Sequence, residues 1–144
     1  MILIGADHAG LAMKEFLKKF FEKNHIEYTD LGPHSLDPKD DYTDYAKKVA
    51  RGVQKSRGKA QGILICGSGV GMSIAANRFT GIRAALVCNT KMARLSKEHN
   101  HSNVLCLANW FITNKEALSM LKEWLKTPYS KEKRHVRRVK KMEN

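Results

Sequence analysis

One cysteine in this chain stands where a thiol could do chemistry. Cys66 ends the apolar run 63–66, and glycines follow at alternate positions, Gly67, Gly69 and Gly71. Glycines let a backbone turn tightly, so that several N–H groups can face one small volume. The helix expected next would direct its own unpaired N–H groups to the same place. Because such a field favours a thiolate, the pattern predicts a reactive sulfur beside a loop that stabilises negative charge.

Other interpretations of this stretch can be weighed from the residues alone. A cysteine often fills a strand as a small buried hydrophobic side chain, and that interpretation of Cys66 stays open. A dinucleotide-binding loop is disfavoured, because Met72 stands where the third glycine of that fingerprint belongs. A nucleoside-triphosphate loop is disfavoured as well, since no Lys-Ser or Lys-Thr pair follows the glycines.

Polar side chains follow the first expected strand. Asp7 and His8 come directly after the apolar run 2–5, and open α/β sheets bind their ligands at the carboxyl ends of the strands. A helix cap is the alternative for Asp7, and a solvated loop residue is the alternative for His8. Tyr42 lies at the entry of a later helix, where it could contact a ligand or belong to the core.

A second histidine lies near the end of a helix expected over 90–99. His99 shares a helical face with Met92 and Leu95, so the spacing predicts that its ring points inward. The C-terminal end of a helix dipole raises the pKa of an imidazole, which suits a group that exchanges protons. A hydrogen-bonded core histidine is the alternative. Asn100 follows as a cap or as a polar ligand contact.

The elements that must hold these residues alternate regularly along the chain. Apolar runs are separated by segments with helical periodicity, which is typical of a parallel sheet covered by helices on both faces. We therefore expect an α/β fold: a Rossmann-like three-layer α/β/α sandwich with a five-stranded parallel sheet, in a single domain over 1–144. The expected strands are 2–5, 27–31, 63–66, 82–87 and 104–108, and the expected helices are 11–24, 42–53, one from the glycines to about 79, 90–99, and one between a capping box at 113–116 and Pro128. Asp41 or Thr43 should cap the second helix and Thr90 the fourth.

Composition limits the classes of protein. The chain has 144 residues, a formal charge of +12, 42% hydrophobic residues and three well-separated cysteines. No apolar run approaches the roughly 20 residues of a membrane span, and the cysteine spacing fits neither a disulfide framework nor a zinc site. We therefore expect a cytoplasmic protein without a membrane partner. The positive charge suits either nucleic acid or a small phosphorylated substrate.

Part of the positive charge is concentrated at the C-terminus. Residues 131–144 carry seven lysines and arginines against two glutamates. The region 130–144 is expected to be a basic C-terminal helix or tail with Arg134 and Arg138 on one side, a spacing that suits a two-pronged grip on a phosphate. A solvated basic tail is the alternative.

Five blocks of sequence together resemble the ribose-5-phosphate isomerase type B family, which includes galactose-6-phosphate and allose-6-phosphate isomerases. The blocks are GADHAG at 5–10, CGSGVGMSIAANR at 66–78, GIRA at 81–84, EHN at 98–100 and RHVRRV at 134–139. They occur in the family's order and extend over nearly the whole chain. The resemblance implies a cofactor-independent aldose–ketose isomerase of the pentose phosphate pathway. Such an enzyme interconverts D-ribose 5-phosphate and D-ribulose 5-phosphate through a cis-enediolate.

The family's functional positions can be transferred to this chain one residue at a time. By resemblance, Cys66 is the base, Ser68 handles the proton on the sugar oxygens and His99 opens the furanose ring. The positions implied to bind substrate are Gly67, Gly69, Val70 and Gly71 for the enediolate, Asp7, Tyr42 and Asn100 for the sugar, and His8, Arg134 and Arg138 for the phosphate. The resemblance also implies a homodimer with its sites at the subunit interface and neither metal nor organic cofactor, and it leaves open whether dimers pair into tetramers.

One position departs from the family pattern. Trp110 stands where members often have an arginine shortly after the fifth strand. A hexose 6-phosphate isomerase is therefore the competing hypothesis within the same class, although the retained Cys66, His99 and Asn100 favour the pentose enzyme. A basic nucleic-acid-binding module is the competing hypothesis from another class. It is disfavoured, because the sequence has no recognition motif and no aromatic residues interleave with the basic run.

Overall fold

Five short segments form the strands of one sheet in the computed structural model, which describes residues 1–143; all are mainly apolar except the edge strand over 28–30. The strands are β1 (Ile2–Ala6), β2 (Tyr28–Asp30), β3 (Gln61–Cys66), β4 (Ala84–Leu86) and β5 (Val104–Ala108). All neighbouring strands are parallel, and their order across the sheet is β2-β1-β3-β5-β4. The expected five-stranded parallel sheet is confirmed, and β3, which ends in Cys66, lies at its centre.

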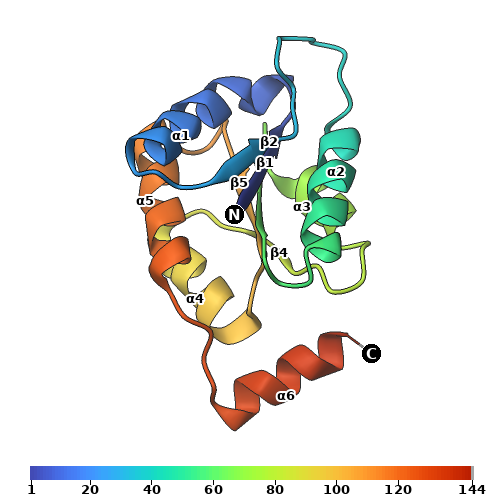
Figure 1. Ribbon diagram of the computed structural model, residues 1–144, viewed down its shortest axis with the longest axis vertical. Coiled ribbons are helices and arrows are strands. Elements are labelled where there is room, and N and C mark those ends of the chain that lie inside the picture. The colour runs from blue at the N-terminus through green and yellow to red at the C-terminus, as the bar shows by residue number, and fades with distance from the viewer. Residues whose placement is uncertain (144) are drawn as a thin grey trace.

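Helices connect the strands and cover both faces of the sheet (Figure 1). They are the 3-10 turn η1 (His8–Gly10), α1 (Leu11–Lys23), α2 (Tyr42–Lys55), α3 (Val70–Ala76), α4 (Thr90–Asn100), α5 (Asn114–Lys126) and α6 (Lys133–Met142). Strand side chains alternate between two cores: Ile63 and Ile65 face α1, α4 and α5, whereas Leu64 and Cys66 face α2 and α3. The expected α/β/α sandwich is confirmed, and α6 lies apart from it, beyond the end of α4 (Figure 1).

Local signals account for two of the long helices. α1 buries Met13, Leu17 and Phe21, which recur every fourth residue on one helical face. α5 begins with the predicted capping box, in which Thr113 Oγ1 accepts from the Glu116 N–H and the Glu116 carboxylate accepts from the Thr113 N–H. None of the helices in residues 1–143 combines the length and apolar character needed to cross a membrane.

Two expected caps differ from those in the structure. Asn89 rather than Thr90 caps α4, because the extended backbone at Asn89 lets its Oδ1 accept from the Met92 N–H at 2.8 Å. Asp41 occupies the position before α2, but its side chain makes no capping hydrogen bond. The prediction that Thr90 caps its helix was therefore wrong, and Asp41 precedes α2 with only its main-chain carbonyl accepting from the helix, from the Asp44 N–H at 3.0 Å.

α3 is shorter than expected and ends at Ala76 rather than near residue 79. The Asn77 side chain donates to the Ala84 carbonyl at 2.9 Å and accepts from the Ala84 N–H at 2.8 Å. These two bonds to the main chain of Ala84, seven residues further on, hold residues 77–84 in a turn, so the helix does not continue. β4 is correspondingly limited to Ala84–Leu86.

The buried face of α4 is not the one that periodicity predicts. Met92 is 42% exposed, whereas Ala93 and Lys97 are buried. The Lys97 ammonium lies 3.8 Å from the centroid of the Trp124 ring. A lysine stem can pack as an apolar group while its charge meets an aromatic face, so Lys97 takes a core position. His99 itself is half-buried, and its ring lies against the buried His135 of α6.

Candidate active site

Cys66 lies at the carboxyl end of the central strand, where its sulfur meets the glycine loop. The Gly69 N–H donates a hydrogen bond to Cys66 Sγ, with an N···S distance of 3.0 Å. Gly69 has a left-handed backbone with φ of +73°, a conformation that favours glycine over any other residue. The loop therefore uses a glycine to place a main-chain donor on the sulfur.

Burial outweighs this donor in setting the protonation state of the thiol. Burial raises the pKa of Cys66, the Gly69 amide lowers it by less, and the nearby Asp7 carboxylate raises it further. The expectation that the loop favours a thiolate is therefore wrong for the single chain. The side chain is only 5% exposed, so an anion there loses more hydration than the amides replace.

β1 brings Asp7 next to Cys66. The Asp7 N–H donates to the Ile65 carbonyl at 3.1 Å, and Asp7 Oδ1 accepts from the Gly10 N–H at 2.9 Å. The helix-cap interpretation of Asp7 thus applies, and burial also raises the pKa of its carboxyl group. Gly10 is required here, because a larger residue would collide with the Ile65 carbonyl oxygen. One short turn therefore fixes a carboxyl group close to the thiol.

Two aromatic side chains lie against the glycine loop. A Cβ on Gly71 would come within 2.6 Å of the Tyr42 ring, and a Cβ on Gly67 would come within 2.5 Å of the Trp110 ring. The Trp110 N–H also donates to the Gly67 carbonyl at 3.0 Å. Tyr42 is exposed rather than part of the core, and Trp110 is 69% exposed. Both rings therefore border the open side of the loop.

The outer residues of the loop are accessible from outside. The Val70 N–H donates to Ser68 Oγ at 3.3 Å, which leaves the hydroxyl hydrogen of Ser68 available to a ligand. Ser68 is half-buried and Val70 is exposed.

His8 is held by a residue that the sequence did not single out. Asp40 accepts hydrogen bonds from the His8 backbone N–H at 3.1 Å and from His8 Nδ1 at 2.7 Å. The sequence signal for Asp40 is its place in an acidic loop before α2, which does not specify a partner 32 residues away. His8 is therefore more than a solvated loop residue.

The other expected site residues lie at the opposite edge of the sheet. α4 begins after the carboxyl end of β4 and runs back, so His99 and Asn100 lie at the amino edge. α6 packs there: the His135 and His99 ring centroids are 4.1 Å apart, while Arg134 and Arg138 are exposed. Figure 1 shows α6 and the end of α4 at one end of the molecule and the loop before α2 at the other.

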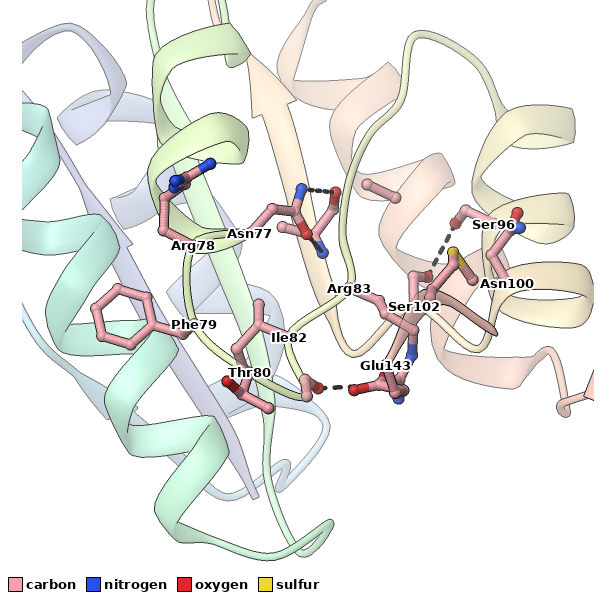
Figure 2. A pocket seen from close by; sticks show the side chains of 14 residues that line it. Asn77, Arg78, Phe79, Thr80, Ile82, Arg83, Ser96, Asn100, Ser102 and Glu143 are labelled. Atoms are coloured by element: carbon pink, nitrogen blue, oxygen red, sulfur yellow. Dashed lines mark hydrogen bonds and ion pairs between the residues drawn. The ribbon is translucent and has the colours of Figure 1, made fainter. Parts of the chain in front are cut away.

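A cavity of about 550 Å³ opens at the amino edge (Figure 2). The turn after α3 forms one wall, and Ser96 and Asn100 of α4 form the opposite one. Arg83 and Glu143 make an ion pair at its rim. Asn100 therefore has concave surroundings in its own chain, at the edge remote from Cys66.

One chain thus carries two separate halves of the expected site. The carboxyl edge holds Asp7, His8, Tyr42, Cys66 and the loop of Gly67, Ser68, Gly69, Val70 and Gly71, and the amino edge holds His99, Asn100, Arg134 and Arg138. The six residues of β3 separate the two edges by about 20 Å. In residues 1–143, no three His, Cys, Asp or Glu side chains come together as a metal site would require.

A comparison with protein families connects this arrangement to known proteins. The family model described as Ribose/Galactose Isomerase matches residues 2–142. The chain belongs to this family. The family and the fold indicated by the sequence are thereby confirmed.

Several ribose-5-phosphate isomerases are similar to this chain over more than nine tenths of their own length. The probable ribose-5-phosphate isomerase B of Mycoplasma genitalium is 41% identical, over 98% of this chain and 92% of the relative. Ribose-5-phosphate isomerase B of Escherichia coli is 38% identical, over 96% of this chain and 91% of the relative. A crystal structure of the Mycoplasma genitalium enzyme with bound ribulose-5-phosphate has a TM-score of 0.95 at 41% identity, covering 99% of this chain and 93% of that chain.

Proposed function

We propose that this chain is an isomerase that interconverts D-ribose 5-phosphate and D-ribulose 5-phosphate. The observation that carries the proposal is the Cys66 sulfur, 3.0 Å from the Gly69 amide, in a chain with a TM-score of 0.95 to a structure containing ribulose-5-phosphate. Isomerisation needs a base that reaches two adjacent carbons and donors aimed at the enediolate oxygens. A thiol beside a glycine loop supplies both.

The proposed reaction moves one hydrogen from C2 to C1. His99 exchanges protons with the ring oxygen and O1 to open the furanose. The Cys66 thiolate then removes the C2 hydrogen, and the electron pair forms the C1–C2 double bond of the enediolate. Ser68 relays a proton from O2 to O1, the carbonyl forms at C2, and the Cys66 thiol returns its hydrogen to C1. The loop amides stabilise the negative charge on the oxygens throughout.

Groups remote from the reacting carbons would orient the sugar. Binding at the phosphate end holds the open form in place and is used to align the reacting carbons with the base. The proposed sugar contacts are Asp7, Tyr42 and Asn100, the proposed enediolate contacts are Gly67, Gly69, Val70 and Gly71, and the proposed phosphate contacts are His8, Arg134 and Arg138. The basic α6 helix is thus assigned to a substrate phosphate rather than to nucleic acid.

We propose a homodimer in which the carboxyl edge of one subunit meets the amino edge of its partner. A two-fold axis then completes two identical sites from two incomplete halves. Such an interface would also cover exposed apolar side chains near the glycine loop, such as Ile74 and Phe111. Dimers could pair further into a tetramer. A cytoplasmic location suits the cysteines, all three of which are free thiols in the described residues.

A hexose 6-phosphate is the competing substrate class, and Trp110 is the reason to test it. This ring occupies the space above Gly67 at the open side of the loop, where it limits or shapes the room for a longer sugar. The family description names both ribose and galactose isomerases. A comparison of kcat/KM for ribose 5-phosphate, allose 6-phosphate and galactose 6-phosphate separates the two substrate classes.

The deciding experiment measures turnover of these sugar phosphates by the purified, chelator-treated protein. Ribose 5-phosphate should have the highest kcat/KM, and Cys66→Ala should lower kcat roughly 10²- to 10⁴-fold, the usual contribution of a positioned base. A higher kcat/KM for a hexose phosphate would reassign the substrate. Full activity in Cys66→Ala would remove the thiol from the mechanism.

A further inference from the structure

Asp40 is a buried carboxylate that binds His8 and also faces the phenol of Tyr45 on α2, whose pKa burial and the Asp40 charge raise. Its Oδ1 accepts from the His8 backbone N–H at 3.1 Å and from His8 Nδ1 at 2.7 Å. The Asp40 side chain is 6% exposed, whereas that of His8 is 37% exposed. Within residues 1–143, no side chain or main chain makes a hydrogen bond of standard geometry to the other carboxylate oxygen, Oδ2, and the neutral Tyr45 phenol nearby supplies no counter-charge. The carboxylate is therefore enclosed, and the imidazole lies between it and the solvent.

This geometry determines which ring nitrogen can meet a ligand. An ionised carboxylate has no hydrogen to donate, so His8 Nδ1 must carry the hydrogen of their shared bond. In the neutral imidazole the remaining nitrogen, Nε2, is then bare and can only accept. A phosphate dianion presents only acceptors, so the neutral ring could not bind the dianion through Nε2. Only the doubly protonated ring can donate from Nδ1 to Asp40 and from Nε2 to a phosphate.

The charges around His8 favour that doubly protonated form. The hydrogen bond to Asp40 raises the pKa of His8, and the carboxylates of Asp7, Asp40 and Asp37 add to the increase, while desolvation opposes it. A buried carboxylate without a counter-charge is unfavourable. The proton on His8 provides that counter-charge.

We propose that Asp40 is a positioning residue that holds His8 as an imidazolium with its Nε2–H directed outward, toward the phosphate of the substrate. The role of His8 in phosphate binding rests on the proposed function above. Asp40 itself would not touch the substrate. Its contribution is to select the tautomer and the charge of the residue that does.

Proton binding and phosphate binding are therefore linked. The protonated form of His8 is the one that binds phosphate. Phosphate affinity is therefore present below the pKa of His8 and is lost as the pH increases through that pKa. Removing the Asp40 charge should lower the pKa of His8, so the loss of phosphate affinity should begin at a lower pH. The ionisation of the phosphate itself, and the arginines proposed to join it from the partner subunit, are common to every variant.

The first test requires no turnover. In the ¹⁵N-labelled wild-type protein, the nitrogen shifts of His8 should identify the Nδ1–H tautomer at high pH and a doubly protonated ring below its titration midpoint. In Asp40→Asn, the midpoint should move to lower pH. A neutral ring with its hydrogen on Nε2 in the wild type would overturn the proposal, whether or not the variant folds.

The second test compares Asp40→Asn with Asp37→Asn, which removes the same charge from the same loop without breaking a hydrogen bond to His8. Above neutral pH, KM for ribose 5-phosphate should increase about fivefold in Asp40→Asn, because the ion pair between His8 and the substrate phosphate is lost. Fivefold is the upper range for one solvent-exposed ion pair. Saturated kcat should change little in either variant, and Asp37→Asn should shift KM much less than Asp40→Asn, because Asp37 makes the smallest contribution to the raised pKa of His8.

Two results of the kinetic comparison would contradict the proposal. An equal KM shift in both variants would show that loop charge in general, and not the Asp40–His8 contact, is responsible. A fall in kcat with an unshifted KM–pH profile would assign Asp40 a merely structural role. If the wild type does not turn over ribose 5-phosphate, the proposed function fails, while the nitrogen shifts still decide the tautomer of His8.

Discussion

The Cys66 thiol balances loss of hydration against main-chain hydrogen bonding. Its side chain belongs to the core beneath α2 and α3, yet its sulfur accepts the Gly69 N–H. Burial raises the pKa of the thiol, so the thiolate is a small fraction of the free chain at neutral pH. An isomerase that depends on this thiolate must gain rate as the pH increases toward that pKa.

We expect iodoacetamide to alkylate Cys66 with a pH midpoint above that of an ordinary cysteine. The thiolate is the species that reacts, and the raised pKa delays its formation. The measurement uses a Cys88→Ser background because Cys88 is exposed; Cys106 is 0% exposed and so is shielded from the reagent, whereas Cys66 is 5% exposed. The kcat/KM for ribose 5-phosphate should increase over the same pH interval. Alkylation at or below the ordinary midpoint would mean that the glycine loop, and not burial, controls the thiol.

The sequence indicated the residues proposed here to do chemistry but not their protonation states. An apolar run followed by glycines is a local pattern, and it placed Cys66 at a strand end correctly. The burial of its sulfur depends on α2 and α3, which pack against it from elsewhere in the chain. The Asp40–His8 pair joins positions 32 residues apart, so no local pattern could identify it.

Among the elements, a buried lysine ties α1 to the strand and loop that precede α2. Lys14 is 0% exposed, and its ammonium donates to Asp30 Oδ1 at 2.8 Å, to Asp30 Oδ2 at 3.0 Å and to the Pro33 carbonyl. Lys18 donates to Asp30 Oδ2 at 2.8 Å. One carboxylate thus organises the start of the loop that carries Asp40.

Asp30→Asn is expected to destabilise the fold by about 3–5 kcal/mol, because it removes the nearest counter-charge of the buried Lys14 cation and leaves only the longer ion pair with Glu15 at 3.6 Å. Lys14→Met removes that charge and keeps an apolar side chain of similar length, so it should cost much less. Urea unfolding at neutral pH measures both free energies. Equal losses in the two variants would show that the hydrogen bonds, and not the uncompensated charge, dominate.

The same network predicts how the Asp30→Asn effect depends on pH. Burial alone would raise the pKa of Asp30, but the ammonium groups of Lys14 and Lys18 outweigh it and leave that pKa lowered. A carboxylate with a lowered pKa in the folded state adds stability above its unfolded pKa, and this stability is lost as the pH falls through the folded pKa. The difference between wild type and variant should therefore narrow in acid. If the difference in free energy of unfolding stayed constant as the pH fell, the ion pairs of Asp30 with Lys14 and Lys18 would not account for the stability.

Periodicity predicted the helices that bury several large apolar side chains, including α1, which buries Lys14 beside them, and it failed in α4, whose buried side chains are one alanine and one lysine. The buried faces of α1 and α5 contain large apolar side chains such as Leu17 and Leu121, so the spacing of apolar residues in the sequence predicts which face is buried. In α4 the buried pair is Ala93 and Lys97, and a hydropathy pattern counts the lysine as exposed. The charge of Lys97 is accommodated by Trp124, a residue of a different helix.

For the whole molecule, the parallel topology separates the two halves of the proposed site. Every strand leads to the carboxyl edge and every covering helix returns to the amino edge. Cys66 at a strand end and His99 at a helix end are thus held apart by the length of the sheet. The sequence identified both groups of residues, but their separation follows only from the three-dimensional path of the chain. A second copy of the chain is the simplest source of the missing half.

Two inactive variants should therefore restore each other's activity. Cys66→Ala inactivates the carboxyl-edge half, and His99→Gln inactivates the amino-edge half. When equal amounts are unfolded and refolded together, half of the dimers are mixed and each has one of its two sites intact, so about one quarter of the wild-type activity should return. Each variant refolded alone is the control, and an affinity tag on one variant verifies that mixed dimers have formed. If tagged mixed dimers remain as inactive as the controls, Cys66 and His99 do not act together across a subunit interface.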